Sequence, residues 1–351
     1  MKVIVLIDKF KNSIDSMTIG NIVSLNLAKR NIKADYFPIS DGGNGFLSSI
    51  SFNKKYVKQN VVTFNADNEK INTFYYQDGN IGYIESAMCV GIKNDNHDIY
   101  KATSKGLGMI IKEAYKKGVR KFFIGLGGTL TNDGGKGMLE ELGFDFNDKV
   151  TYKEIIPLNE CDFICVSDVN NKLLGNDGAT YVYAMQKGAK ETDLPILEKR
   201  MEDFASCINN YLHKDYSNYE KTGAAGGLGF AFISLLKAKL VNGLDFVLDY
   251  FKIDSIIDNY DYIITGEGKI DQQSLQGKVV YSLSSRYKNK KIIAICGENT
   301  LGLDKKDNII KIYSIVPNIT DYQSSMEDPT KYLNMLLDTI IIDWKKNNKV
   351  I

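Results

Sequence analysis

Short aliphatic runs alternate with amphipathic stretches at both ends of the chain, a pattern typical of buried parallel strands joined by helices. The runs interpreted as strands are Val3–Ile7, Tyr36–Ile39, Tyr262–Thr265, Ile292–Cys296 and Ile312–Val316. The stretches with apolar residues at helical spacing are Ser16–Arg30, Val279–Tyr287 and residues 329–345. This alternation predicts a doubly wound sheet to which both ends of the chain contribute.

The middle of the chain has a different pattern. Val57–Phe64, Ile71–Tyr76 and Ile81–Ser86 alternate apolar and polar residues, and Asn, Asp and Gly residues separate them. Such spacing is typical of antiparallel hairpins. Beyond them, the predicted strands are Lys121–Gly125 and Phe163–Val166, and the predicted helices are Gly106–Lys117, residues 193–213 and residues 226–239. The middle is therefore expected to be a mixed α/β domain.

Together these patterns predict an α/β protein in which a flavodoxin-like parallel-sheet domain holds an inserted second domain. We expect the flavodoxin-like domain to be discontinuous, with residues 1–55 and 250–351. The inserted mixed α/β domain is expected to span residues 56–249. In open α/β sheets ligands bind beyond the carboxyl ends of the strands, so the loops that follow the predicted strands are where chemistry is expected.

The charge is balanced, with 44 Lys and Arg against 43 Asp and Glu in 351 residues, a net charge of +1. This balance disfavours a dedicated nucleic-acid or membrane-surface binder, because such proteins carry a basic face. No apolar run reaches the roughly 18 residues of a membrane span, and the apolar N-terminal stretch is too short for a signal peptide. The five scattered cysteines indicate reduced thiols, and His97 and His213 lie in polar stretches expected at the surface. We expect a cytoplasmic protein without nucleic-acid or membrane partners.

Glycine is concentrated at four places. Residues 42–45, 125–137, 223–229 and 266–268 make 27 positions but hold 15 of the 30 glycines, where the usual glycine content of roughly 7% would give about two. Glycine lets backbone N–H groups approach anionic oxygen atoms, and nearby carboxylates can bind Mg²⁺ or a substrate hydroxyl. We expect these segments to converge as walls of one anion-binding cleft. The segment 223–229 has no acid and is expected to present amides at a helix N-terminus.

Two common nucleotide-binding motifs are absent. The Gly277-Lys278 pair is not part of a P-loop, because Gln272 stands where the first glycine belongs. The first strand–helix turn, Asp8–Ser13, has no G-x-G-x-x-G, which disfavours a Rossmann dehydrogenase.

A set of short segments occurs in a defined order along the chain. They are Asp8-Lys9-Phe10-Lys11-Asn12-Ser13, Ser40-Asp41-Gly42-Gly43-Asn44-Gly45, Gly82–Ala87, Thr103–Gly108, Gly125–Gly135, Asp168–Gly175, Gln186-Lys187-Gly188-Ala189, Gly223–Gly229, and Gly266–Asp271 with Gln276-Gly277-Lys278. In this order they resemble blocks of the bacterial glycerate kinase family, of the glycerate 2-kinase type, such as D-S-F-K-x-S, A-D-G-G-E-G, G-A-A-G-G-L-G and G-E-G-x-x-D. The matching blocks run from residue 8 to 278, so the resemblance covers nearly the whole chain.

The resemblance implies ATP-dependent phosphorylation of a hydroxyl of D-glycerate, assisted by Mg²⁺, with 2-phosphoglycerate as the favoured product. It also implies two α/β domains with the active site in the cleft between them. The partners are then small molecules, D-glycerate and ATP, and we expect a monomer or a homodimer. Some positions depart from the family pattern. Lys9 replaces Ser, Asn44 replaces Glu, and Lys172 replaces Pro, and the first two bear on substrate preference.

Phosphoryl transfer depends on positioning and charge neutralisation more than on covalent chemistry. The candidate catalytic residues are Lys11, Asp168 and Asp271, and the candidate metal ligands are Asp168 and Glu267. The candidate substrate- and phosphate-binding residues are Asp8, Ser13, Asp41, Gly42, Gly43, Gly127, Gly128, Asn132, Asp133, Gly134, Gly135, Lys187, Gly226, Gly227 and Lys278. Lys11 is expected to pair with the transferring phosphoryl group or with the glycerate carboxylate.

The role of each carboxylate stays open at this point. Asp168 is the first choice for Mg²⁺ binding or for accepting the proton of the glycerate hydroxyl. The alternatives are Asp41, Asp133, Glu267 and Asp271. Two other functions also remain: a kinase for another small hydroxy acid, and a non-catalytic sensor of a phosphometabolite. The set of lysines and carboxylates disfavours the sensor, because a binder needs no base.

Overall fold

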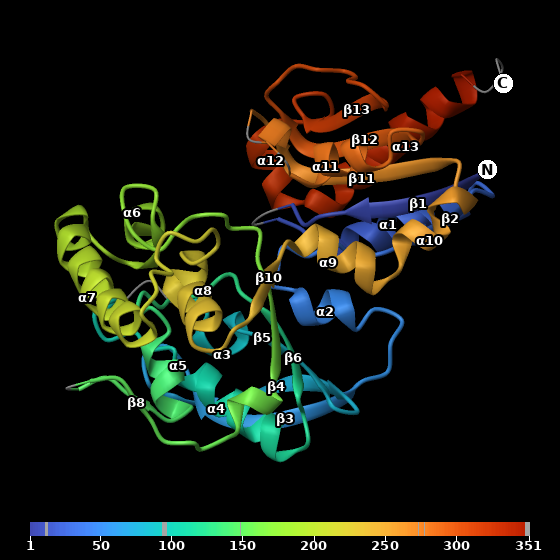
Figure 1. Cartoon of the computed structure of the whole chain (residues 1–351). Coiled ribbons are helices and arrows are strands. Elements are labelled where there is room, and N and C mark those ends of the chain that lie inside the picture. Colours follow the sequence, from blue (N-terminus) through green and yellow to red (C-terminus); the bar gives the residue numbers. More distant parts are fainter. Residues whose placement is uncertain (11–12, 93–96, 148, 273, 277, 348–351) are drawn as a thin grey trace. The chain divides into compact units, whose positions relative to one another are not determined.

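The computed structural model describes residues 1–10, 13–92, 97–147, 149–272, 274–276 and 278–347. The chain forms two compact units (Figure 1). Unit 1 comprises Met1–Ser40, Ser48–Phe52 and Val247–Ile351, and unit 2 comprises Asp41–Leu47 and Asn53–Phe246. Two helices, α2 (Phe46–Ile50) and α9 (Gly243–Tyr250), contain points where the chain passes from one unit to the other.

Unit 1 is built on a five-stranded sheet that draws on both ends of the chain, blue and orange to red in Figure 1. Its strands are β1 (Lys2–Ile7), β2 (Lys33–Tyr36), β11 (Tyr262–Ile270), β12 (Lys291–Asn299) and β13 (Ile309–Val316). All neighbouring pairs are parallel, in the order β13-β12-β11-β1-β2. Read from the other edge, this is the flavodoxin order 2-1-3-4-5. The predicted flavodoxin-like parallel sheet is confirmed.

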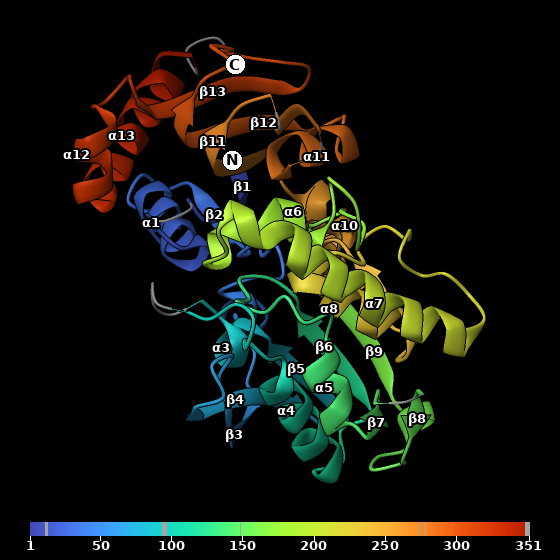
Figure 2. The same ribbon diagram turned by 90° about the vertical axis from the view of Figure 1, so that its left-hand side faces the viewer.

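Helices cover both faces of this sheet, because its central strands are apolar on both sides. The helices of unit 1 are α1 (Ser16–Ala28), α10 (Ile253–Ile256), α11 (Val279–Arg286), α12 (Tyr322–Glu327) and α13 (Pro329–Asn347). Figure 2 shows α1, α12 and α13 on one side of the sheet and α11 on the other. One face packs Val3, Val5 and Ile7 with residues of α1 and α13 in a single apolar cluster.

The second strand begins earlier than the sequence indicates. The apolar run suggested Tyr36–Ile39, whereas β2 is Lys33–Tyr36. The reason is its place at the sheet edge, where residues alternate between exposed and half-buried and need few apolar side chains. Pro38, which follows, has no backbone N–H to donate to a neighbouring strand. Ile39 is buried, but it lies in the loop after β2 and not in the strand.

Unit 2 contains a six-stranded mixed sheet in the order β10-β9-β6-β5-β4-β3. The strands are β3 (Val57–Phe64), β4 (Lys70–Asp78), β5 (Ile81–Glu85), β6 (Lys121–Gly125), β9 (Asp162–Val166) and β10 (Lys239–Val241), and β7 (Phe144–Asp145) pairs separately with β8 (Thr151–Tyr152). β3, β4 and β5 form the predicted antiparallel hairpins, and β5, β6, β9 and β10 run parallel. The predicted second α/β domain of mixed type is confirmed.

Helices of unit 2 pack onto one apolar cluster that includes the sheet. They are α3 (Ala87–Val90), α4 (Lys105–Lys116), α5 (Lys136–Glu141), α7 (Leu194–Leu212) and α8 (Ala224–Ser234), while α6 (Ala179–Tyr183) contacts α7 and α8. The cluster joins Phe122 and Phe163 of the sheet to residues of α4, α5, α7 and α8, among them Met201 and Phe232. This core fixes the carboxyl ends of four parallel strands at one edge, where three of the four predicted glycine segments lie.

Candidate active site

Three of the four glycine segments meet at the carboxyl edge of the unit 2 sheet. Residues 42–45 lie against the ends of β6 and β9. A methyl group on Gly42 would lie 2.1 Å from the carbonyl oxygen of Val166, and one on Gly127 would lie 2.6 Å from Cα of Gly43. Only glycine permits this backbone-to-backbone approach. The segment Asp41–Leu47 therefore belongs with unit 2, whereas the sequence placed it with residues 1–55.

The segment 223–229 joins the same assembly through the loop after β6. The amide of Gly134 donates to the carbonyl oxygen of Gly226 over 3.1 Å. A methyl group on Gly227 would lie 2.7 Å from Cα of Gly134. The predicted convergence is thus seen for three glycine segments within unit 2. The fourth, 266–268, belongs to unit 1, and its convergence with the others stays a prediction.

The backbone of 223–229 is not the regular helix N-terminus that the sequence suggested. Ala225, Gly226 and Gly227 have φ values of 54°, 66° and 89°, so three successive residues are left-handed inside the span of α8. Residues with a Cβ rarely adopt this conformation, although Ala225 does so here, and this preference explains glycine at positions 226 and 227. Successive N–H groups in such a kinked segment can form a concave anion-binding surface.

Asp168 lies directly beyond β9, at the edge where these segments meet. Its Oδ1 accepts a hydrogen bond of 2.6 Å from the amide of Gly243, which follows β10. Among the described residues, Oδ2 has no hydrogen-bond partner. The pKa of Asp168 is raised to about 6, mainly by burial and also by the carboxylate of Asp41, while the hydrogen bond from Gly243 and the charge of Lys221 oppose the rise. A carboxylate with one oxygen held by the backbone suits metal binding or proton acceptance.

Asp133 has a different environment from Asp168. Its Oδ2 accepts hydrogen bonds from the amide and hydroxyl of Ser104 (2.8 and 2.7 Å) and from the amide of Gly137 (3.2 Å). Its Oδ1 accepts from the amide of Gly135 (3.0 Å). These donors tie the loop after β6 to the start of α4, so the carboxylate fixes the shape of the loop. The neighbouring Asn132 is buried and donates from Nδ2 to Thr180 (3.3 Å).

Lys187 is almost completely buried, with 4% of its surface exposed. Its Nζ donates to the carbonyl oxygen of Thr131 over 2.8 Å. A methyl group on Gly226 would lie 2.9 Å from the same Nζ, so the ammonium stands behind the left-handed glycine segment. Burial lowers the pKa of Lys187 to about 8, and Asp133 partly offsets this. In this structure Lys187 holds the Thr131 loop beside the glycines.

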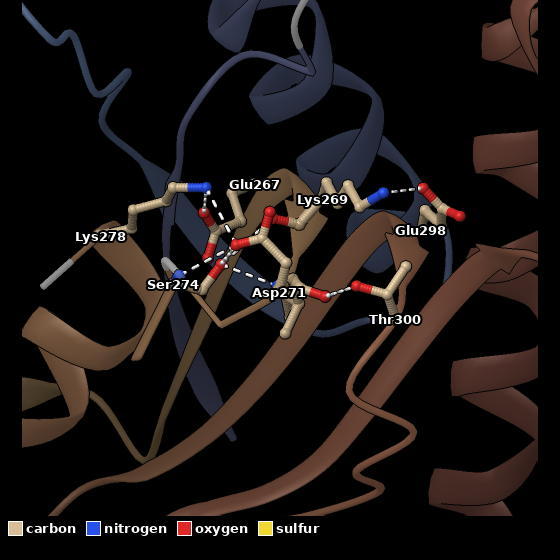
Figure 3. A network of polar contacts seen from close by, with 8 residues as sticks. Glu267, Lys269, Asp271, Ser274, Lys278, Glu298 and Thr300 are labelled. Carbon is tan, nitrogen blue, oxygen red and sulfur yellow. Dashed lines mark hydrogen bonds and ion pairs between the residues drawn. The ribbon is translucent and has the colours of Figure 1, made fainter. Parts of the chain in front are cut away.

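Unit 1 carries its own polar cluster after β11. Figure 3 shows Lys278, at the start of α11, reaching toward Glu267 and Asp271. Lys278 Nζ lies 3.4 Å from Oδ1 of Asp271 and 3.9 Å from Oε2 of Glu267. Asp271 Oδ1 also accepts from the amide of Ser274 over 3.1 Å, at the short helix η5 (Ser274–Gln276). One lysine therefore pairs with two carboxylates at the carboxyl end of a central strand.

Glu267 is the most buried carboxylate of this cluster, with 5% of its surface exposed. Its Oε1 is buried and has no hydrogen-bond partner within the described parts of the chain. Burial raises its pKa to about 7, Lys278 and Ser274 oppose the rise, and the carboxylates of Asp8 and Asp271 add to it. Asp8 follows β1. The amide of Asp8 donates to the carbonyl oxygen of Gly266 over 3.0 Å. An unpartnered buried oxygen beside a lysine suits a further polar ligand.

The comparisons with known proteins agree on one family. Residues 3–345 match the sequence model of the "Glycerate kinase family". The chain belongs to the glycerate kinase family. It is similar to the glycerate kinase of Bacillus cereus, with 31% identity over 98% of both chains. It is also similar to the glycerate 2-kinase of Escherichia coli strain K12, with 29% identity over 91% of both chains.

A solved structure supports the same grouping. The crystal structure of a protein assigned as glycerate kinase 2 from Salmonella typhimurium LT2 matches over 100% of both chains, with a TM-score of 0.81 and 26% identity. The chain is thus a kinase, and membership of the glycerate kinase family implies ATP as the phosphate donor.

Some candidate residues of this glycerate kinase family member are not placed with the others. Lys11 lies outside the described residues. Ser13 closes the turn after β1, where its amide donates to the carbonyl oxygen of Phe10 over 2.9 Å. Within the part of the chain that the structure describes, no group of three or more His, Cys, Asp and Glu could hold a metal ion. Nor is any helix there long and apolar enough to cross a bilayer.

The sequence reading of the family motifs missed three side chains that shape the site. Glu85, at the end of β5, accepts from the amides of Gly45 (3.2 Å) and Leu47 (3.0 Å). Ser104 bridges Asp133 to the amide of Met138. Lys221 contacts the loop that carries Asp168. Glu85 and Ser104 lie inside segments that resemble the family, and this position could have identified them as candidates. Lys221 lies just before such a segment, so the motifs gave no signal for it.

Proposed function

We propose that this protein phosphorylates D-glycerate with ATP, assisted by Mg²⁺, and that the product is 2-phosphoglycerate. The observation that carries the proposal is the meeting of three glycine segments with Asp168 at one sheet edge, in a chain of the glycerate kinase family. Relatives named glycerate kinase and glycerate 2-kinase match over nearly their full length, which supports the substrate and the position of transfer.

The glycine segments of unit 2 would bind phosphate or carboxylate oxygens through backbone amides. Their left-handed residues, Gly42, Gly128, Gly134, Gly226 and Gly227, can turn successive N–H groups toward one point. Phosphoryl transfer needs such donors, because charge spreads over the oxygens of the transferring group. Lys278, in unit 1, and Lys11 stay phosphate-binding residues proposed from the sequence.

Asp168 and Glu267 are the ligands that the sequence proposes for a magnesium ion. Mg²⁺ in kinases is commonly held by one or two carboxylates together with phosphate oxygens and water. Asp168 offers Oδ2, and Glu267 has a buried oxygen without a hydrogen-bond partner among the described residues. Each residue could contribute an oxygen ligand from its own unit, and that both bind one ion stays a proposal from the sequence.

Asp168 is also the first choice for accepting the proton of the glycerate hydroxyl. The surroundings of its competitors favour other roles. Asp133 is bound by four donors that fix its loop, and Asp271 caps η5 and pairs with Lys278. A carboxylate whose pKa is raised toward neutrality is better matched to proton transfer than one at its ordinary value. That residues of both units act on the same substrates stays a proposal from the sequence.

The test is coupled measurement of ADP release with D-glycerate, L-glycerate and tartronate, each with and without Mg²⁺. We expect turnover with D-glycerate that depends on Mg²⁺, and phosphorus NMR of the same sample to show 2-phosphoglycerate. Turnover with another acid in preference to D-glycerate would contradict the substrate assignment. A product of 3-phosphoglycerate would contradict only the position of transfer.

A second candidate is a kinase for another small hydroxy acid. Asn44 stands where the family pattern has Glu, and its Oδ1 lies 2.5 Å from a methyl group built on Gly128, next to the glycine edge. A neutral amide in place of a carboxylate changes which acceptor groups are tolerated there. The tartronate arm of the same assay tests this alternative.

A further inference from the structure

Lys221 lies among three loops at the carboxyl edge of the unit 2 sheet. Its Nζ donates to the carbonyl oxygen of Ser167 (3.0 Å) and to Oδ1 of Asn170 (2.8 Å), both in the loop after β9. It also donates to Oδ1 of Asn242, in the loop after β10. An ammonium group has three N–H donors, and all three are used. Lys221 therefore has no donor left for a phosphate oxygen.

The two loops that Lys221 joins are those that hold Asp168 in place. Ser167, which accepts from Lys221, directly precedes Asp168. Asn242, which also accepts from Lys221, directly precedes Gly243, whose amide donates to Oδ1 of Asp168. The lysine thus fixes both the loop that carries the carboxylate and the loop that supplies its hydrogen bond.

The backbone of Lys221 links the same region to the glycine segment 223–229. Its φ is 68°, a left-handed conformation that is uncommon for residues other than glycine. Its amide donates to the carbonyl oxygen of Asn170 (3.3 Å), and its carbonyl oxygen accepts from the amide of Ala224 (3.1 Å). A methyl group on Gly229 would lie 2.2 Å from that carbonyl oxygen.

We propose that Lys221 is a positioning residue that clamps the Asp168 loop, the Asn242–Gly243 turn and the start of the glycine segment into one arrangement. The consequence for the reaction rests on the proposed function of Asp168. Lys221 acts through Asp168 and the glycine amides and does not touch the substrates. Charged groups near the clamp are Asp41, Asp168, Asp245 and Glu220.

The test compares Lys221→Met with the control Lys237→Met in the full-length protein. Lys237 lies in the same unit, is exposed and is also left-handed, with φ of 53°. Amide hydrogen exchange followed by mass spectrometry reports on the clamp without any substrate. We expect at least about tenfold faster exchange in peptides covering 167–170 and 242–243 for Lys221→Met and no change for Lys237→Met. Unchanged exchange would overturn the proposal.

A double-mutant cycle tests whether the clamp acts through Asp168. We expect Lys221→Met to lower kcat by about 10- to 100-fold, with a small change in KM, because misplacement of a reacting group affects the chemical step. In the Asp168→Asn background the same change should have little further effect. A full additional loss in that background would show a general structural role and overturn the positioning assignment.

Two further variants separate the possible failures. Asn242→Ala removes one acceptor and keeps the lysine, so it covers the case in which Lys221→Met does not fold, and we expect faster exchange at 242–243. Lys221→Arg keeps the positive charge but replaces the compact ammonium group with a planar guanidinium group. We therefore expect exchange protection between that of the unmodified protein and that of Lys221→Met. If Asp168→Asn has normal turnover, the proposed function of Asp168 fails, and the exchange result still decides whether Lys221 clamps the loops.

Discussion

The amide of Gly243 donates a hydrogen bond of 2.6 Å to Oδ1 of Asp168, although the two residues are 75 positions apart in the chain. The bond joins the loops after β9 and β10, two neighbouring parallel strands. It leaves the other carboxylate oxygen without a hydrogen-bond partner among the described residues. The first prediction follows from this geometry.

Asp168→Asn is expected to lower kcat by at least about 100-fold, the usual range for the loss of a proton acceptor or of a charged group at the reacting phosphoryl. An asparagine retains an oxygen that can accept from Gly243, so the fold should be preserved. Steady-state ADP release measures the loss of kcat, and circular dichroism checks that the fold is preserved. Asp177→Asn, at an exposed aspartate of the same unit, is the control and should keep normal turnover. Turnover within threefold of the unmodified enzyme for Asp168→Asn would contradict the assigned role.

The pH dependence of kcat/KM is expected to show a loss of activity on the acid side. Burial raises the pKa of Asp168 to about 6 and that of Glu267 to about 7. Both groups act as carboxylates in the proposal, and a carboxyl group is ionised above its pKa. Activity should therefore be full above pH 8 and fall as pH decreases through 7 and 6, by about tenfold per pH unit where one group titrates. A profile that stays level down to pH 5 would contradict a raised pKa of these groups in the working enzyme.

Gly226→Ala is expected to destabilise unit 2 strongly. A methyl group at this position would lie 1.8 Å from the carbonyl oxygen of Thr131, and the residue is left-handed with φ of 66°. Gly79→Ala is the matched control, because Gly79 is also left-handed (φ 56°) in the same unit but has open space around it. The control should lose about 1 kcal/mol, from the backbone conformation alone, and Gly226→Ala about 3 kcal/mol or more. Urea unfolding measures both, and equal losses would mean that the steric contact is relieved.

Lys187 is expected to make stability depend on pH in the alkaline range. Burial lowers its pKa to about 8 in the folded protein, from an ordinary value of 10.5 in the unfolded chain. Between these values the unfolded chain binds the proton more tightly, so the folded state becomes relatively more stable as pH rises. The penalty is complete below about pH 8 and fades toward pH 10.5, with a total on the order of 3 kcal/mol.

The measurement compares the unfolding free energies of the unmodified protein and Lys187→Met from pH 7 to pH 10. The unmodified protein should gain stability relative to the variant across this range. Lys190→Met, at an exposed lysine nearby, is the control and should show no such trend. A difference between the proteins that does not change with pH would show that Lys187 is charged in both states.

Lys11→Ala is expected to lower turnover by at least about 100-fold while the protein stays folded, since transition-state charge stabilisers commonly have effects of this size. The expectation comes from the sequence motif, because Lys11 lies outside the described residues. Lys29→Ala, at an exposed lysine at the end of α1, serves as the control. Normal turnover in Lys11→Ala would remove this residue from the mechanism.

The sequence by itself determined the parallel sheet of unit 1 and the family. Strands such as Val3–Ile7 and Ile292–Cys296 are apolar on both faces. A continuous apolar run of this kind is typical of a central strand that helices cover on both sides, so the local composition identifies such strands. The order of the motifs along the chain identifies the family without any knowledge of distances in the folded protein. The edge strand β2 was predicted a few residues too late in the chain, because a half-exposed strand has no continuous apolar run to mark it.

Only the tertiary structure decided how the candidate residues differ from one another. Asp133 and Asp168 are alike in sequence context, each in a motif after a strand. The fold surrounds Asp133 with four donors and gives Asp168 one, which comes from Gly243. The clamp at Lys221 and the left-handed run at Ala225–Gly227 are equally invisible to pattern reading. Both depend on which backbone groups from distant segments come within hydrogen-bonding distance, and that is set by packing of the whole unit.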